Sequence, residues 1–485
     1  MSQAGFVGGQ YQPLSKEQII TIHSAALKIL AETGFTYENG LEEVLDLLSA
    51  AGMMVDREAG RIYFPKHIIS ELIERSPSRV LLCGRETEND LNLKGDHVYL
   101  GTGGAAIWVL DLNSGQLRDS TLKDIYDMGR LADRLRNIHF YLRPCIPKDI
   151  DKELYDENVF YACFKATGKH VMAGVNDEKG LDTMLNMAAG IAGKESDFLE
   201  RPFASVITSF AISPLKLCTQ STKIMMAAVR QHVPVALSCA PMAGSTSPIT
   251  MAGTLVLTHA EQLAGIALAQ VVSPGAPVLY GGIPGMANLN NLGYLGGAVE
   301  FGIMNAAIHQ LAKHINVPNY NSSGLSDAKI PDAQAGWEKG MSTLLVAMGG
   351  SNYVHHAAGM LDSMLAVSYE QLVIDDEIIG MSNQVLKGVE VDPEHLALDV
   401  IDEIGPGNAF IKSKHTRKHM LSEYYTTNGV TNRKKYERWV GDGSPNTWDR
   451  ARRIAQAILS ESEQSYLPES VDAWIRKTYD IRLYH

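Results

Sequence analysis

The stretch NVPNYNSSGLSDAKIPDAQAGWEK, residues 316–339, decides how the fold is interpreted. A short apolar–polar run after Pro318 predicts a strand at 319–322, and an amphipathic helix is predicted from about 332 to 348. A polar turn containing Gly324 joins them. Strand, polar turn and helix in this order present side chains at the carboxyl end of a parallel sheet, where α/β enzymes place their chemistry. The alternative is an ordinary loop in which Ser326 or Asp327 caps the helix.

The same alternation of strands and helices continues along most of the chain. Predicted strands cover 98–101, 138–142, 170–173, 203–208, 234–238, 278–281, 319–322 and 353–356, and helical segments lie between them. This pattern predicts a closed (β/α)8 barrel, with an open doubly wound sheet as the alternative. We expect three parts: a mixed α/β cap at 1–95, a catalytic barrel at 96–388 and a helical subdomain at 389–485.

Composition narrows the class of protein. A chain of 485 residues with 45% hydrophobic and 20% charged residues is typical of a globular enzyme with a large core. The net charge of −12 and the lack of a basic stripe argue against nucleic acid and anionic membrane surfaces as partners. Five scattered cysteines without a CxxC pair indicate neither a disulfide framework nor a zinc knuckle. We find no leader-like start and no uninterrupted apolar stretch of about 18 residues, and therefore expect a cytoplasmic protein.

A family resemblance rests on the same central stretch. The segments SDAK at 326–329, DAQAG at 332–336 and EK at 338–339 resemble the signature of the trimethylamine methyltransferase family, and the resemblance extends over most of the chain. These enzymes pass a methyl group from a methylated amine to the cobalt of a corrinoid protein. In the archaeal members that use trimethylamine, pyrrolysine precedes the SDAK run. Leu325 occupies that position here, so the chain resembles the non-pyrrolysine branch.

The resemblance implies a TIM-type barrel, a corrinoid (cobalamin) supplied by a small partner protein, and a methylated amine as substrate. We expect a quaternary amine, because its leaving group is already a neutral tertiary amine and needs no pyrrolysine. Glycine betaine is the best single candidate, and proline betaine, carnitine and γ-butyrobetaine are alternatives. A zinc-dependent methyltransferase or a non-catalytic binding protein would be a different kind of function on the same barrel, and we expect no directly bound metal.

Arg143 is the strongest candidate for a substrate contact. It follows the second predicted strand in an apolar context, where an unpaired arginine is costly. Its guanidinium could clamp a substrate carboxylate in a bidentate way, or it could form an ion pair with Asp149 or Asp151. Tyr280 and Tyr99 lie near strand ends and could surround a quaternary nitrogen, although most aromatic residues in such positions belong to the core.

The predicted turn and the helix before it supply further candidates. Asn321, Ser323 and Asp327 are expected to bind substrate, although Asp327 could merely cap a helix. Leu325 is expected to form a wall of the methyl-binding pocket. Glu300 could balance a bound cation, or could simply complement a helix dipole.

His355 and His356 end the last predicted strand. Adjacent residues of a strand point to opposite faces, so at most one of these two histidines is expected to face the barrel mouth. This argues against a metal site made from the pair, and His356 is our candidate for catalysis. A satisfied structural histidine is the alternative for either residue.

The glycine runs and the C-terminal tryptophans each lead to one further expectation. The glycine runs at 101–104 and 281–285 follow strands without forming a dinucleotide-binding motif, which suggests a backbone that approaches a broad, flat ligand such as a corrinoid face. Trp439, Trp448 and Trp474 lie in the C-terminal part and suggest an apolar surface buried in a homo-oligomer.

Overall fold

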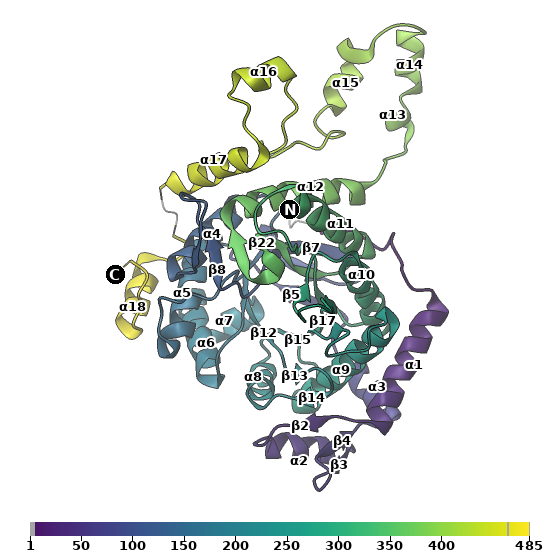
Figure 1. The fold of residues 1–485 in the computed structure, drawn as a ribbon, viewed down its shortest axis with the longest axis vertical. Coiled ribbons are helices and arrows are strands. Elements are labelled where there is room, and N and C mark those ends of the chain that lie inside the picture. Colours follow the sequence, from purple (N-terminus) through teal and green to yellow (C-terminus); the bar gives the residue numbers. More distant parts are fainter. Residues whose placement is uncertain (1–4, 463–464, 485) are drawn as a thin grey trace.

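The computed structural model describes residues 5–462 and 465–484, and within them eight parallel strands close into a barrel (Figure 1). The strand order around the barrel is β7-β10-β11-β12-β15-β17-β20-β21. The two hydrogen-bonded arcs meet at a bridge between Tyr280 and Asn319, and where His139 N donates to Leu100 O over 2.8 Å. The strands are β7 (His97–Thr102), β10 (Phe140–Leu142), β11 (His170–Ala173), β12 (Ala204–Thr208), β15 (Val235–Cys239), β17 (Val278–Gly282), β20 (Tyr320–Ser322) and β21 (Tyr353–Ala358). The predicted (β/α)8 barrel is confirmed, and the open sheet is wrong.

A ring of helices covers the barrel, and local signals set their ends. Thr121 caps α4 with a capping box. Asp332 caps α11 by accepting from Ala335 N, and Gly350, with a φ of 96°, ends it. The N-cap of α11 is therefore Asp332, and not Ser326 or Asp327. The ring consists of α4 (Leu122–Arg134), α5 (Tyr155–Ala166), α6 (Glu178–Ala192), α7 (Glu195–Glu200), α8 (Thr219–Arg230), α9 (Met251–Val272), α10 (Val299–His314), α11 (Ala333–Gly349) and α12 (Tyr369–Lys387).

The barrel interior is a packed core closed at its amino-terminal end. The hairpin of β5 (Val80–Leu82) and β6 (Leu91–Leu93) packs into the same apolar cluster as the inward side chains of the barrel strands. Aromatic rings then stack toward the carboxyl end: Phe140 and Tyr353 have centroids 3.6 Å apart, and Tyr320 lies 4.3 Å from His355. Because the amino end is filled, only the carboxyl end leaves room for a ligand.

Loops that follow the barrel strands build two short sheets at the carboxyl end. One sheet contains β22 (Met360–Leu361), β23 (Ala366–Ser368), β8 (Trp108–Leu110) and β9 (Leu117–Asp119). The other contains β16 (Met242–Ala243), β18 (Gly285–Ala287) and β19 (Tyr294–Leu295). These sheets raise the walls around the mouth of the barrel.

The N-terminal part packs on one side of the helix ring. Its helices are α1 (Lys16–Glu32), α2 (Glu42–Ala50) and α3 (Lys66–Glu74), and both α1 and α3 contact α9. By length and composition α9 could cross a membrane, but 83% of its most apolar window is buried inside the protein. Helix α9 is therefore a core helix, and α1 and α3 cover its outer side.

The C-terminal part divides into a packed and a projecting portion (Figure 1). Helix α17 (Thr447–Ser460) contacts α12 and α4, and α18 (Glu469–Thr478) contacts α6. The helices α13 (Pro393–Leu396), α14 (Leu398–Ile404), α15 (Lys414–His419) and α16 (Tyr436–Gly441) extend away from the barrel. The division of the chain into three domains stays a prediction.

A buried ion pair fixes the ends of two neighbouring barrel strands. Lys339 of α11 and Asp375 of α12 are both fully buried, with Nζ 3.1 Å from Oδ2. The Lys339 ammonium also donates to the carbonyls of Gly324, after β20, and Met360, after β21. Asp375 Oδ2 accepts from Gly359 N over 2.7 Å. Two helices thereby hold both loops that form this side of the barrel mouth.

We predict that Lys339→Met lowers the free energy of unfolding by about 3–5 kcal/mol, because it leaves the Asp375 carboxylate buried without a cation. The double variant Lys339→Met/Asp375→Asn should recover part of this loss, since asparagine is uncharged and can still accept from Gly359. Urea denaturation at pH 7 measures both. A single variant within about 1 kcal/mol of the parent, or a double variant no more stable than the single, would contradict the assignment.

Candidate active site

A cavity of about 890 Å³ opens at the carboxyl ends of the barrel strands. All eight strands contribute lining residues at or beyond their ends, from Gly104 after β7 to His356 in β21. The lining includes the guanidinium-bearing Arg143, the aromatic Tyr294 and Tyr320, and several polar side chains. Its volume lies within the roughly 300–1,000 Å³ range of small-molecule sites.

Both His355 and His356 line this cavity, contrary to expectation. A register shift between Val354 and Ala358 interrupts the alternation of β21, and His356 has a left-handed φ of 61°. The two imidazoles therefore lie side by side, with centroids 3.6 Å apart and ring planes tilted by 40°. The prediction that at most one faces the mouth is wrong because a β-bulge turns the second ring to the same side.

Burial keeps both histidines neutral. Burial, aided by the nearby Lys339 ammonium, lowers the pKa of His356 to about 3. Burial also lowers the pKa of His355 well below its usual range, and His356 adds to this effect. Hydrogen bonds hold the rings: His355 Nδ1 lies 3.1 Å from the Tyr320 hydroxyl, and His356 Nδ1 lies 2.8 Å from Ser322 Oγ. At neutral pH they present uncharged aromatic surface to the cavity.

Arg143 reaches the cavity without an ion-pair partner among the described residues. Its Nη1 donates to the Tyr155 hydroxyl over 2.5 Å and to Cys145 O over 3.4 Å, and its buried Nε has no hydrogen-bond partner in the described part of the chain. Asp149 instead accepts from Leu122 N over 2.8 Å. The alternative of an ion pair with Asp149 or Asp151 is therefore wrong.

The SDAK segment is held from within the protein. Glu338 of α11 accepts from Ser326 Oγ over 2.6 Å and from Asp327 N over 2.9 Å. Asp327 lines the cavity, and its Oδ1 accepts from Gly296 N over 3.0 Å and from the Ser363 hydroxyl. Asp327 therefore joins the loops that follow β17, β20 and β21 and adds a negative charge to that side of the cavity.

Three predicted substrate-binding residues point elsewhere. The Tyr280 hydroxyl lies 2.8 Å from His259 Nδ1 of α9, in the layer between strands and helices. The Tyr99 hydroxyl accepts from Asn92 N over 3.2 Å, near the filled amino-terminal end. Asn321 Nδ2 donates to the carbonyl of Asn305, and so it turns toward α10. These assignments to the cavity are wrong. Strand alternation puts Leu279 and Tyr320 inward in place of Tyr280 and Asn321, whereas Tyr99 points inward but lies too near the amino-terminal end.

Three further candidates are outside the lining of the cavity. Leu325 is fully buried, and a Cβ added to Gly296 would lie 2.9 Å from Leu325 Cβ, so Leu325 backs the wall without facing the cavity. Ser323 is buried and donates its N–H to His355 O over 3.2 Å. Glu300 lies in the first turn of α10. None of the three contacts the cavity directly, so direct roles for them in the cavity are not supported.

The glycine runs mostly serve packing within the protein. A Cβ at Gly101 would lie 2.5 Å from the Phe140 ring, and one at Gly281 would lie 2.1 Å from Leu237 O. Both glycines therefore permit neighbouring strands to approach each other. The expectation of a broad ligand beside these runs is wrong for these two residues, whereas Gly104 does line the cavity.

Sequence reasoning missed Tyr294 in the long loop after β17 and Asp362 in the loop after β21. Tyr294 lies close enough for the Asp327 charge to add to the effect of burial in raising its pKa. The only local signal for Tyr294 is an aromatic residue in a loop rich in glycine and asparagine. Its approach to the cavity depends on the pairing of β18 with β19, which joins residues of one loop.

A (β/α)8 barrel with a polar and aromatic cavity at this end is the architecture of an enzyme. Residues 7–482 match the family model described as trimethylamine methyltransferase (MTTB). The chain therefore belongs to the trimethylamine methyltransferase family, as its signature predicts.

Individual relatives agree with this assignment. The chain is 32% identical over 462 residues to trimethylamine methyltransferase MttB of Desulfitobacterium hafniense (strain DSM 10664 / DCB-2), covering 95% of this chain and 92% of that protein. It is also 32% identical over 465 residues to the glycine betaine methyltransferase of Desulfitobacterium hafniense (strain Y51), covering 96% and 94%. The crystal structure of monomethylamine methyltransferase (MtmB) from Methanosarcina barkeri aligns with a TM-score of 0.50 at 12% identity, over 93% of this chain and 95% of that one. This last likeness shows the fold alone.

We predict that the buried neutral state of His356 makes stability depend on pH. An unfolded histidine takes up a proton near pH 6.5, whereas His356 in the native protein resists it down to about pH 3. Its contribution is therefore complete above pH 6.5 and is lost as the pH falls toward 3. His356→Asn, which tolerates the left-handed backbone, should make the loss of stability between pH 7 and 4.5 shallower.

Urea midpoints at several pH values measure this dependence. His67 is exposed on α3, so His67→Gln is the matched control and should leave the pH dependence of the parent unchanged. Identical pH dependence in His356→Asn and the parent would refute the neutral buried state.

Proposed function

We propose that this protein removes a methyl group from a quaternary amine, with glycine betaine as the best single candidate, and transfers it to the cobalt of a corrinoid carried by a small partner protein. Membership of a methyltransferase family supports the reaction, and one relative is a glycine betaine methyltransferase. The choice of substrate rests on Arg143, whose guanidinium reaches the cavity without a carboxylate partner among the described residues. A betaine supplies that carboxylate.

The cavity has two unlike sides that suit a betaine. Arg143 follows β10, and Tyr294 belongs to the loop after β17. Strands β10 and β17 are four positions apart in a ring of eight, so they stand on opposite sides of the barrel. Asp327, after the neighbouring β20, adds a carboxylate on the side of Tyr294. A substrate with one cation and one carboxylate can therefore meet an opposite charge at each end.

The side of the cavity formed by β20 and β21 suits a quaternary nitrogen. The rings of Tyr320, His355 and His356 face the cavity, and the two imidazoles are neutral. Cation–π contacts are worth roughly 0.5–2 kcal/mol each, according to how far the cation is desolvated. The Lys329 ammonium also reaches the lining, but it pairs with Asp362 at 3.1 Å, so its charge is balanced.

Transfer of the methyl group requires the protein mainly to position the donor. The N–CH3 bond breaks with its electron pair left on nitrogen, so the leaving group is a neutral tertiary amine that needs no proton. The corrinoid, when bound, supplies a cobalt nucleophile as methyl acceptor. The residues of the cavity hold the donor, direct one methyl group toward the opening and exclude water; such positioning lowers a barrier by roughly 7–11 kcal/mol. The buried Leu325, at the position of pyrrolysine, is consistent with a donor that needs no covalent adduct.

The same cavity leaves room for related donors. Proline betaine, carnitine and γ-butyrobetaine carry the same two charges, and a cavity of about 890 Å³ can admit each of them. A zinc-dependent transfer has less support, because among the described residues groups of three potential ligands occur around His395 and not at the barrel mouth. A binding protein without activity would hold the same ligand without demethylating it. We further infer a cytoplasmic homo-oligomer with neither nucleic acid nor membrane as partner.

We predict that Arg143→Ala weakens binding of glycine betaine by about 1.5–3 kcal/mol, the worth of a charge-assisted hydrogen bond. Tetramethylammonium has no carboxylate and should bind the variant almost as well as it binds the parent. Isothermal titration calorimetry with both ligands measures the difference. Equal losses for the two ligands would make Arg143 structural, and an unchanged affinity for glycine betaine would remove it from the site.

Two matched variants separate charge from geometry. Arg143→Lys keeps the positive charge but loses the planar fork, and should fall between Ala and the parent. Tyr155→Phe removes the hydroxyl that lies 2.5 Å from Arg143 Nη1 and leaves the charge in place. It should therefore weaken glycine betaine binding far less than Arg143→Ala does.

A further inference from the structure

The segment 389–425 leaves the barrel after α12 and returns before α17, and it projects from the body of the protein (Figure 1). Between Leu386 and Val430 the structure buries none of the hydrophobic residues that it describes. Val389, Ile411 and Leu421 are 90%, 75% and 77% exposed. A segment of this length without a core of its own needs another means of holding its helices together.

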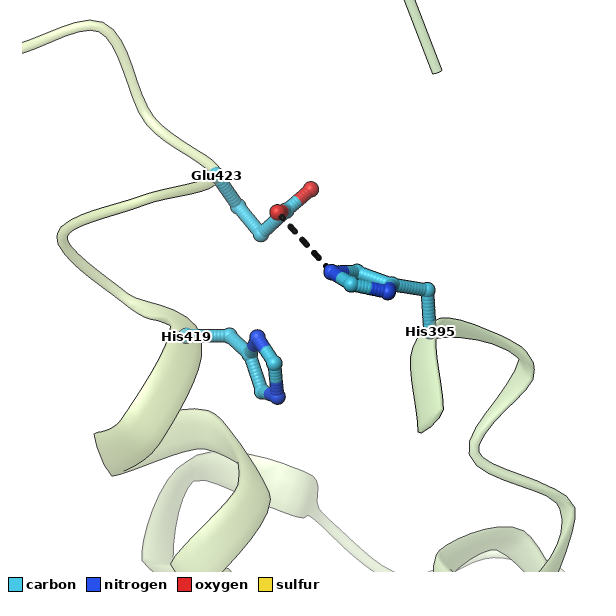
Figure 2. A group of neighbouring side chains, drawn as sticks. All are labelled: His395, His419 and Glu423. Carbon is cyan, nitrogen blue, oxygen red and sulfur yellow. Dashed lines mark ion pairs between the residues drawn. The ribbon is translucent and has the colours of Figure 1, made fainter. Parts of the chain in front are cut away.

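The projecting segment does bring together a cluster of side chains that are good metal ligands (Figure 2). His395 of α13, His419 at the end of α15 and Glu423 just beyond it bring one potential ligand atom each to within 4.8 Å of one another. His419 is 9% exposed and is the buried residue of the projecting segment. Both imidazoles and the carboxylate face a common gap.

Carboxylates outside this gap orient the two rings. Asp392 Oδ1 lies 2.9 Å from His395 Nδ1, which directs Nε2 toward Glu423, 3.9 Å away. Glu394 Oε1 lies 3.0 Å from His419 Nε2, which leaves Nδ1 of that ring for the gap. A carboxylate hydrogen-bonded behind a histidine is the usual support of a metal-binding imidazole, because it fixes the ring and raises its basicity, and Asp392 gives His395 this support.

A fourth ligand is within reach. Glu390 Oε2 lies 3.5 Å from His395 Nε2, on the same nitrogen that faces the gap. Ligands at about 2.0–2.1 Å in a tetrahedral zinc site lie about 3.4 Å from one another. The three converging ligand atoms therefore need to close by roughly 1.4 Å at most. Glu423 is half-exposed and can make this movement without disturbing a packed core.

We propose that His395, His419 and Glu423, with Glu390 as fourth ligand, bind a divalent first-row metal ion, zinc by preference. Two imidazoles and two carboxylates form a mixed nitrogen and oxygen set that suits Zn²⁺ and its neighbours better than Ca²⁺ or Mg²⁺. The site lies on the projecting segment and not at the barrel mouth. Its role is structural: it joins α13 to the end of α15 and so closes the segment into one unit.

The first test uses the unaltered protein after treatment with a chelator. Titration with Co²⁺ should give visible absorption bands that saturate at one equivalent per chain and disappear when Zn²⁺ is added. Zn²⁺ should also slow tryptic cleavage within residues 412–418 at least about tenfold. An absence of saturable Co²⁺ bands, or cleavage that Zn²⁺ does not change, would overturn the proposal and leave an ion-pair cluster only.

Variants then locate the ion. His395→Gln removes a ligand and should weaken Co²⁺ binding at least about 100-fold, whereas Asp392→Asn removes only the support of that ligand and should weaken it about 10–100-fold. Asparagine also keeps the helix cap that Asp392 provides. His67→Gln, on the exposed face of α3, is the control and should bind as the parent does. Parent-like binding by His395→Gln would overturn the assignment, and circular dichroism confirms that each variant remains folded.

Discussion

The buried pair of Lys339 and Asp375 controls the shape of the barrel mouth, because one ammonium group contacts the loops after two adjacent strands. Burial of both charges is costly, and the pair is retained where a fixed geometry is needed. It holds Gly324 so close to β21 that an added Cβ would lie 2.7 Å from Ala357 Cα. The same ammonium also helps to keep His356 neutral. A structural ion pair therefore sets both the position and the charge of groups in the cavity.

The cavity that results combines three features. Eight strand ends surround it, a bulge adds a second imidazole, and an arginine reaches it without an ion pair among the described residues. The neutral rings and Asp327 lie on the side of β20 and β21, and Arg143 lies beyond β7 on β10. This separation of charge is the reason for proposing a zwitterion rather than a simple amine as the substrate.

Much of the fold could be predicted from sequence, and the reasons for the failures are physical. Apolar segments separated by helical segments predicted the eight strands, because a strand that is buried on both faces is apolar along most of its length. Arg143 was found because it directly follows a strand, and Asp327 because it belongs to the polar turn between β20 and α11. Tyr280 was misplaced because one residue of phase decides which face of a strand a side chain takes. The second histidine was missed because a bulge has no local sequence signal here.

Contacts between distant segments explain the remaining omissions. Tyr294 reaches the cavity through the pairing of strands within a long loop, which its own sequence does not specify. The cluster on the projecting segment has a partial signal, since His415, His419 and Glu423 follow one another at intervals of four residues. On a continuous helix that spacing would place them on one side, although α15 ends at His419 and Glu423 lies just beyond it. The position of His395 beside them required the fold.

Methyl transfer itself is the most direct test of the proposed function. The purified protein is incubated with the proposed partner, a small protein carrying reduced corrinoid, and methylation of the corrinoid is followed by absorbance with glycine betaine or trimethylamine as donor. The two-sided cavity predicts that glycine betaine is demethylated to dimethylglycine and that trimethylamine is not a substrate. Transfer from trimethylamine in preference to glycine betaine, or from no quaternary amine at all, would contradict it.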